Sequence, residues 1–328
     1  MGKTRRFNLR NKASMQVVHG YTDVPQGARG AVLAIGNFDG VHRGHQALIK
    51  AAADEARRLG APAGVLVFEP HPREFFHPEE PHFRLTPLKE KLQIFEALGL
   101  DLAIVLDFDA ELAGLSAEHF IARVLVKGLA VRHVVIGYDF FFGRNRGGTP
   151  ETMRLAAGEL GFGITVVAPV AEDGEAFSSS AIRVHLAQGD VKGAARLLGR
   201  WWRVGGSVVG GAKRGVGLGF PTANVPLPRG TGLGHGIYAV RAYLSGERYD
   251  GAAYLGTRPT YDDGMPVLEV FLFGFDGDLY GRDIGVEFID FVRADRKFDT
   301  SEALIAQMLA DCARAEEILA RAPATPSA

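Results

Sequence analysis

The first half of the chain alternates short apolar runs with segments of helical periodicity. The apolar run at 31–35 is followed by apolar residues at three- and four-residue spacing up to Gly60, which indicates a buried strand and then a helix. The pattern repeats, with strands expected at 63–68, 102–106, 133–136 and 164–167, and helices at 88–98, 116–126, from 150 onward and at 178–188. This alternation predicts an α/β fold with a doubly wound parallel sheet, which binds ligands beyond the carboxyl ends of its strands.

The pattern changes to β near residue 189. After a short helix at 191–198, strands are expected at 202–209, 237–244, 248–256, 267–273 and 284–292, with an amphipathic helix at 301–320. Several strands and a terminal helix predict a small β-barrel closed by that helix. We therefore expect two domains, residues 15–186 with the parallel sheet and residues 187–322 with the barrel.

Composition narrows the class of protein. The 328 residues are 47% hydrophobic and carry a net charge of −1, so no global basic field favours nucleic acid or an anionic membrane. The single cysteine, Cys312, excludes an internal disulfide and favours a reducing compartment, which we expect to be the cytoplasm. No apolar run reaches transmembrane length, and the basic start lacks the apolar segment of a secretory signal. Residues 1–14 are expected to form a poorly ordered tail, with Met15 as an alternative start, and the oligomeric state stays open.

The turn after the first apolar strand carries the richest motif, Gly36-Asn37-Phe38-Asp39-Gly40-Val41-His42-Arg43-Gly44-His45. Its glycines let backbone N–H groups approach an anion, and the helix N-terminus adds partial positive charge. His42 and His45 fall on one face of the opening helical turn, where each can donate a hydrogen bond to phosphate oxygens. The pattern favours nucleotidyl transfer over a structural turn or a histidine pair for a metal, and it resembles the His-x-Gly-His signature of the nucleotidyltransferase superfamily.

A second phosphate site is a candidate at the helix expected from residue 178. Ser178, Ser179 and Ser180 open this helix, and Arg183 stands one turn in. Serine hydroxyls and free backbone N–H groups converge there, which describes either a helix cap or a phosphate site with a bidentate arginine.

Two further loops follow expected strands. Asp139 and the aromatics at 140–142 come after the 133–136 strand, where they either line the core or form a wall for a flat ring. Glu69 follows the 63–68 strand, in position for a ligand contact or for an ion pair with Arg73.

The second half has a glycine-rich segment of its own at 210–220, followed by Pro221-Thr222-Ala223-Asn224. Thr222 and Asn224 are two residues apart, so an extended chain places their side-chain oxygens on one side. Hard oxygen ligands of this kind suit Mg²⁺ that bridges ATP phosphates. The alternative is a flexible loop that ends in a turn at Pro221.

Glu269 is the candidate base of the second half. Strand alternation sends Glu269, Phe271 and Phe273 to one face and the intervening apolar residues to the other. A lone strand carboxylate is usually just solvated. Here its neighbours on the face are aromatic, and a carboxylate there can accept the proton of a hydroxyl that attacks a γ-phosphate.

In order and spacing, these motifs resemble the prokaryotic bifunctional riboflavin kinase/FMN adenylyltransferase (FAD synthetase) family over about Val17 to Asp311. The resemblance implies that the C-terminal domain phosphorylates riboflavin to FMN. It implies that the N-terminal domain joins FMN and ATP into FAD and pyrophosphate. The implied partners are riboflavin, FMN, FAD and ATP as co-substrate, with Mg²⁺ as cofactor.

The resemblance also assigns roles to residues. Catalytic roles fall to His42, His45, Arg183 and Glu269. ATP contacts fall to Gly36, Asn37, Phe38, Gly44, Asp139, Ser179, Ser180, Gly215, Gly219 and Thr222. Flavin contacts fall to Glu69, Phe140, Arg258 and Phe271, and Mg²⁺ ligation to Thr222 and Asn224. Phe141, Phe271 and Gly274 stand where family members often have Arg, His and Asp.

Two other functions stay open. A nucleotidyltransferase with another acceptor, such as a pantetheine or nicotinamide nucleotide, leaves the second domain unexplained. A non-catalytic flavin-binding module predicts flavin binding without turnover.

Overall fold

A computed structural model describes residues 14–172, 174–210, 220–228, 230–257 and 266–326. Their contacts separate into two compact units. The sheet unit contains the described residues up to Phe38, then Gln46–Phe75 and Leu88–Ala168. The barrel unit contains Asp39–His45, Phe76–Pro87 and the described residues from Pro169 onward.

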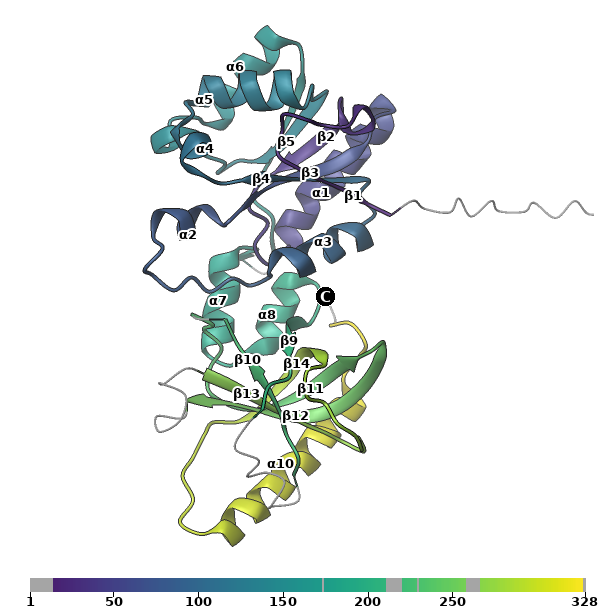
Figure 1. The fold of residues 1–328 in the computed structure, drawn as a ribbon, viewed down its shortest axis with the longest axis vertical. Helices are drawn as coiled ribbons and strands as arrows, with labels where there is room; N and C mark the ends of the chain where they lie inside the picture. Colours follow the sequence, from purple (N-terminus) through teal and green to yellow (C-terminus); the bar gives the residue numbers. More distant parts are fainter. Residues whose placement is uncertain (1–13, 173, 211–219, 229, 258–265, 327–328) are drawn as a thin grey trace, which may run out of the picture. The chain divides into compact units, whose positions relative to one another are not determined.

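The sheet unit is built on six parallel strands (Figure 1). In chain order they are β1 (Gln16–His19), β2 (Val32–Ile35), β3 (Ala63–Glu69), β4 (Leu102–Asp107), β5 (His133–Gly137) and β6 (Gly163–Val167). Their order in the sheet is β1-β4-β3-β2-β5-β6, so the chain runs outward from β2 in both directions. This is the doubly wound sheet that the sequence predicts, and its strand order reverses between β2 and β5.

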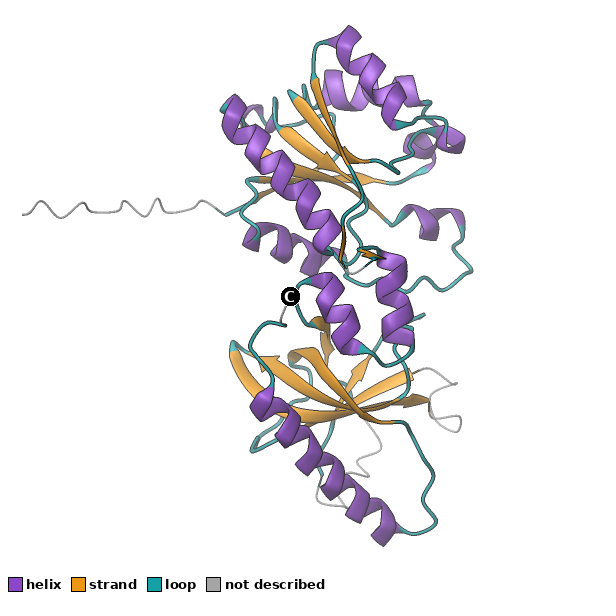
Figure 2. Ribbon diagram, turned by 180° about the vertical axis from the view of Figure 1, so that it is seen from behind, coloured by secondary structure: helices purple, strands orange, loops and turns teal. Residues whose placement is uncertain are grey.

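Helices cover both faces of this sheet (Figure 2). The helices within the described residues that begin in or border this unit are α1 (Arg43–Leu59), α2 (Pro72–Phe76), α3 (Leu88–Ala97), α4 (Ala110–Gly114), α5 (Ala117–His119) and α6 (Pro150–Leu160), with the short 3-10 turns η1 (Gln26–Ala28) and η3 (Arg144–Arg146). Thr149 caps α6 and Pro150 is its first residue, as expected. The helix expected at 116–126 differs, because α5 passes into a π-helix, η2 (Phe120–Gly128).

The barrel unit holds six antiparallel strands in the order β10-β13-β12-β11-β14-β9. They are β9 (Trp202–Ser207), β10 (Ala223–Pro226), β11 (Gly236–Leu244), β12 (Glu247–Thr257), β13 (Pro266–Leu272) and β14 (Asp283–Arg293). An isolated bridge between Val209 and Asn224 joins the two edges of the sheet. The sheet is therefore a nearly closed barrel, as the sequence predicts.

Helices and a short hairpin complete the described part of this unit. The helices are α7 (Ser179–Ala187), α8 (Val191–Leu198) and α10 (Ser301–Arg321), and the hairpin joins β7 (Ala171–Glu172) to β8 (Glu175–Ala176). Ser178 caps α7 and Asp190 caps α8 through hydrogen bonds from backbone N–H groups to their side chains.

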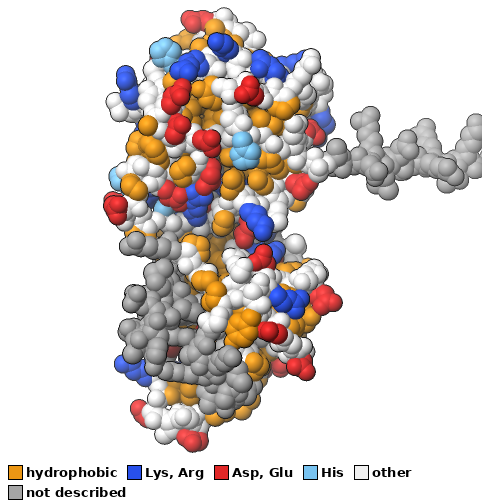
Figure 3. Space-filling model, in the orientation of Figure 1, with side chains coloured by type: hydrophobic (Ala, Val, Ile, Leu, Met, Phe, Trp, Pro, Cys, Tyr) orange, Lys and Arg blue, Asp and Glu red, His pale blue; other side chains and the backbone are white. Residues whose placement is uncertain are grey.

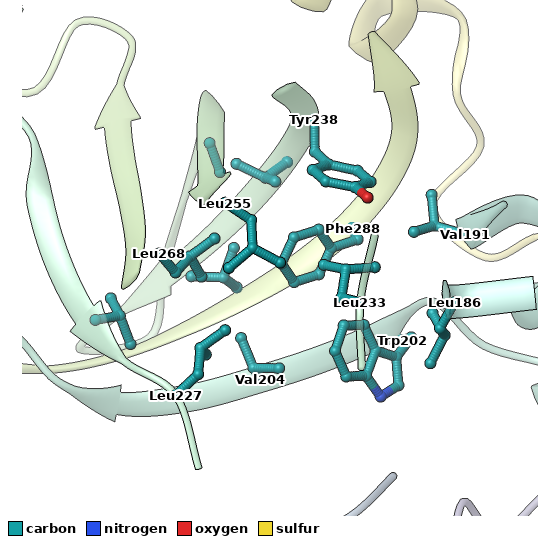
Figure 4. Packing of buried hydrophobic residues seen from close by; sticks show 14 of the residues in the cluster. Leu186, Val191, Trp202, Val204, Leu227, Leu233, Tyr238, Leu255, Leu268 and Phe288 are labelled. Carbon is teal, nitrogen blue, oxygen red and sulfur yellow. The ribbon is translucent and has the colours of Figure 1, made fainter. Parts of the chain in front are cut away.

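Side chains from alternate strand positions fill the barrel (Figure 4). The Phe288 ring stacks on Trp202 with centroids 5.2 Å apart and meets Tyr238 edge-on at 5.3 Å. Leu186 of α7 and Val191 of α8 belong to the same buried cluster. The two helices are thus packed as part of the barrel core.

The terminal helix α10 packs on the outer face of the barrel. Arg293 of β14 binds Asp311 of α10, with Nη2 2.7 Å from Oδ2. Cys312 lies beside this pair against an apolar cluster, and its pKa is raised to about 11 by burial and by the neighbouring Asp311. The thiol is therefore neutral at pH 7 and is not a reactive nucleophile.

None of the helices within the described residues is long and apolar enough to cross a membrane. The expected N-terminal tail at 1–14 lies, except for its last residue, outside the described residues.

Candidate functional sites

In the barrel unit, His42 and His45 lie face to face at the start of α1. Their ring centroids are 3.6 Å apart, and the His45 backbone N–H donates to Nδ1 of His42 at 3.3 Å. A side chain at Gly44 would place its Cβ 3.1 Å from the His42 ring and from the carbonyl oxygen of Phe177. Glycine at 44 is what allows the close packing of this turn.

His42 is held in its neutral form. It is only 6% exposed, and burial together with the positive charge of Arg200 lowers its pKa to about 4. A neutral imidazole has one N–H donor and one acceptor nitrogen, and Nδ1 is the acceptor here. Nε2 is therefore the nitrogen that carries the proton of the neutral ring.

The backbone of this turn is strained and is held from outside. Val41 has a φ of 41°, which is unusual for a β-branched residue, and its side chain is fully buried. The Arg200 guanidinium donates to the carbonyl oxygens of Gly40 at 2.6 Å and Val41 at 3.3 Å. Asp39 accepts hydrogen bonds from the backbone N–H groups of Leu85 at 3.0 Å and Thr86 at 3.2 Å.

Helix α7 brings two predicted residues to the histidine turn, by which we mean residues Asp39–His45. The Ser179 hydroxyl donates to the Asp39 carbonyl oxygen at 2.8 Å. Arg183 binds the Asp39 carboxylate, and its Nε donates to the Phe83 carbonyl oxygen at 2.9 Å. Ser180 is exposed on the same turn of helix. In this structure the Arg183 guanidinium is therefore paired with a carboxylate.

The sheet unit carries its predicted residues at the carboxyl ends of β2, β3 and β5. Gly36, Asn37 and Phe38 follow β2, and Glu69 is the last residue of β3. The Phe38 ring is fully buried against Phe95, 5.6 Å away and edge-on. The buried Lys91 ammonium donates to the Asn37 carbonyl oxygen at 2.8 Å, which places a positive charge beside this turn.

The aromatic loop after β5 divides between core and surface. Phe140 stacks on the buried Phe142 with centroids 5.4 Å apart. Phe141 is exposed, and the Arg146 guanidinium lies 4.9 Å from its ring. Asp139 is exposed at the same strand end. The three aromatics thus do not form one wall: Phe140 and Phe142 pack toward the core, and Phe141 is exposed.

In the barrel, the predicted metal ligands and base meet on one face. Asn224 of β10 pairs with Glu269 of β13, and the Thr222 hydroxyl lies 3.5 Å from the Glu269 carboxylate. Leu268 and Val270 are buried in the barrel interior, so Glu269 faces outward, as strand alternation predicts. Phe271 shares this face, and its ring meets Phe220 edge-on at 5.3 Å.

Three predicted site residues, Gly215, Gly219 and Arg258, lie outside the described residues. Within the described ranges, no group of three or more His, Cys, Asp or Glu side chains is arranged to hold a metal ion. The described residues around His42 and His45 therefore do not support the alternative that this pair binds a metal ion.

Sequence reasoning missed the contacts that position the motifs. Arg200 and Lys91 bind backbone carbonyl oxygens far away in the sequence, 160 and 54 residues from their partners. A side chain that binds a distant carbonyl leaves no spacing pattern to detect. Asp39 stands inside the motif next to Gly40, and that position was the signal in the sequence that could have drawn attention to it.

Comparison with known proteins defines the class first. Residues 24–181 match a family described as FAD synthetase, and residues 198–319 match one described as riboflavin kinase. The sheet and the barrel are therefore those of a two-domain transferase of flavin nucleotide synthesis. The chain also matches known bifunctional riboflavin kinase/FMN adenylyltransferases along almost their entire length. It therefore belongs to this family.

The relatives are similar over both halves. The bifunctional riboflavin kinase/FMN adenylyltransferase of Pseudomonas fluorescens is 42% identical, covering 96% of this chain and 99% of its own. Those of Escherichia coli K12 and Bacillus subtilis are 40% and 36% identical, covering 92% and 91% of this chain and 96% and 95% of their own.

A solved structure shares the fold. It is 30% identical with a TM-score of 0.81, and it covers 93% of this chain and 99% of its own. Its title names a macrolide-efflux protein from Streptococcus pneumoniae.

Proposed function

We propose that the residues described above carry two separate ATP-dependent reactions, riboflavin phosphorylation on the barrel and FMN adenylylation at the histidine turn. The observation that carries the proposal is the convergence of Thr222, Asn224 and Glu269 on one barrel face. The stacked pair of His42 and His45 supports the second site.

For riboflavin phosphorylation, Glu269 acts as the base that accepts the proton of the ribityl hydroxyl as it attacks the γ-phosphate of ATP. The oxygen donors of Thr222 and Asn224 fit Mg²⁺, and they would hold it. The bound ion would offset the negative charge of the ATP phosphates. Gly215 and Gly219 contact ATP, and Arg258 and Phe271 contact the flavin.

For FMN adenylylation, His42 and His45 contact the ATP phosphates and steady the charge that develops as pyrophosphate leaves. Gly44 gives the phosphates access to the backbone of the turn. Ser179, Ser180 and Arg183 hold the triphosphate. Because Arg183 is paired with Asp39, its contact with phosphate would compete with that ion pair.

In the sheet unit, the predicted ligand residues are those at strand ends. Gly36, Asn37, Phe38 and Asp139 contact ATP, while Glu69 and Phe140 contact the flavin. The buried Lys91 ammonium next to Asn37 supports an anionic ligand at this strand end. These residues follow β2, β3 and β5, where sheets of this type bind ligands.

The proposed partners are riboflavin, FMN, FAD and ATP, in the cytoplasm, without nucleic acid or membrane. On the face drawn in Figure 3, basic and acidic side chains are interspersed, which does not favour a polyanion. The single cysteine and the intracellular nucleotide ATP support the compartment.

The proposal is tested by incubating the purified protein with riboflavin, ATP and Mg²⁺ and separating the flavins by chromatography. We expect FMN first and FAD later, with ADP and pyrophosphate released. Riboflavin that binds but is not converted would support a non-catalytic module. Turnover of another acceptor, with FMN left unmodified, would support a different nucleotidyltransferase.

A further inference from the structure

One arginine lies in the segment that matches one family and binds the segment that matches the other. Arg200 lies within 198–319, the range that matches riboflavin kinase. Its guanidinium binds the histidine turn, which lies within 24–181, the range that matches FAD synthetase. Both belong to the barrel unit, because the contacts of Asp39–His45 group that turn with α7, α8 and the barrel.

The contact is specific and charge-assisted. Nη2 of Arg200 lies 2.6 Å from the Gly40 carbonyl oxygen and 3.4 Å from the Thr86 hydroxyl, and Nη1 lies 3.3 Å from the Val41 carbonyl oxygen. The planar guanidinium of Arg200 thus binds two consecutive carbonyl groups of the turn and, in addition, the hydroxyl of Thr86.

The turn needs such support. Gly40 has a φ of 85° and Val41 a φ of 41°, and they immediately precede His42. A strained backbone persists only where surrounding contacts determine it. Leu85 and Leu198 pack closely against Gly40, since an added Cβ there would lie 3.0 and 3.4 Å from their side chains. The polar restraint on the Gly40 and Val41 carbonyls comes from Arg200.

We propose that Arg200 is a positioning residue for FMN adenylylation, supplied to the histidine turn by the kinase-family segment. It fixes the peptide groups of Gly40 and Val41 and thereby the ring of His42. This inference rests on the proposed function of that turn. It implies that the adenylyltransferase reaction depends on residues beyond its own family segment.

The test compares Arg200→Met, Arg200→Lys and Arg203→Met in the full chain. Initial rates of FMN adenylylation and of riboflavin phosphorylation are measured separately, with thermal melting for each variant. Arg203 is the matched control: it carries the same charge three residues on, but its guanidinium lies 5.2 Å from the Tyr243 ring on the barrel.

For Arg200→Met we expect kcat for FMN adenylylation to fall about 10- to 100-fold, with KM for ATP within about threefold of wild type. Riboflavin phosphorylation should be unchanged. Arg200→Lys should recover part of the rate, because an ammonium can still bind one carbonyl but lacks the fork. Arg203→Met should leave both rates unchanged.

Two results would overturn the inference. One is Arg200→Met with wild-type adenylylation. The other is a parallel loss of both activities and of melting temperature in both Arg200 variants, which would make the arginine a general structural residue. A wild-type protein that forms no FAD from FMN would instead overturn the proposed function itself.

Discussion

The charge of His42 follows from where its ring lies. Because its ring is buried beside Arg200, His42 has a pKa of about 4 and takes up a second proton, with its positive charge, only below that pH. At neutral pH it can orient a phosphate oxygen by a hydrogen bond without adding a full positive charge.

The same burial predicts how stability depends on pH. The unfolded chain, with an ordinary pKa of 6.5, binds more protons than the folded chain between pH 4 and 6.5. The stabilisation associated with His42 is therefore complete above pH 6.5, is lost progressively as pH falls from 6.5 to about 4, and does not decrease further below that. Between pH 7.5 and 5, wild type should lose about 2 kcal/mol relative to His42→Gln, measured by urea unfolding. Parallel pH curves for the two proteins would contradict a neutral, buried His42.

The barrel site predicts a change in metal dependence for Thr222→Val, which keeps the shape of the side chain and removes its oxygen. Half-maximal riboflavin phosphorylation should need at least about tenfold more Mg²⁺. The control is Thr231→Val, because the Thr231 hydroxyl binds the Pro228 carbonyl oxygen at 2.7 Å and not the carboxylate of Glu269. An unchanged Mg²⁺ requirement for Thr222→Val would exclude its hydroxyl as a ligand.

Among the elements, strands with a continuous buried apolar run or a long alternating face could be predicted from sequence, and strands defined mainly by their pairing could not. Strands β11, β12 and β14 alternate over nine to eleven residues, and they were expected within one or two residues of their ends. Strand β10 has only four residues and ends on Pro226, and it is a strand because it pairs with β13. Strand β1 is mostly exposed and is defined by pairing with β4.

Helix α10 offers a direct comparison of two ion pairs on one element. Asp311 is 5% exposed and binds Arg293 and Gln307, whereas Glu317 pairs with Arg314 on the exposed side. Asp311→Ala should lower the free energy of unfolding by about 3 kcal/mol because it leaves Arg293 without its carboxylate. Glu317→Ala should cost less than about 0.5 kcal/mol. Equal losses, measured by chemical denaturation, would mean that the Asp311 pair does not anchor the helix.

On the scale of the whole molecule, the motifs were predictable but their supports were not. His42, His45, Thr222, Asn224 and Glu269 carry recognisable spacing, and the structure brings them together as two groups. The residues that hold the histidine turn come from segments between 83 and 200. Such contacts exist only in the folded chain, so no local sequence pattern predicts them.

The boundary between the two domains was expected near residue 186, but α7, which precedes it, packs with the barrel. This difference can be tested with fragments of the chain. Ile182 and Leu186 are fully buried in the barrel core. A fragment of residues 169–326 should therefore be more stable than one of residues 187–326 by at least about 3 kcal/mol. Equal urea midpoints for the two fragments would place the boundary where the sequence suggested it.

The central claim is that two separate sites act in sequence on one flavin. It is tested most directly by assaying His45→Ala and Glu269→Gln, alone and mixed, with ATP and Mg²⁺. His45→Ala should convert riboflavin to FMN and stop, while Glu269→Gln should leave riboflavin but convert added FMN to FAD. The mixture should make FAD from riboflavin, because FMN released by one variant is a substrate for the other. Loss of both reactions in either folded variant, or a mixture that makes no FAD, would contradict the claim.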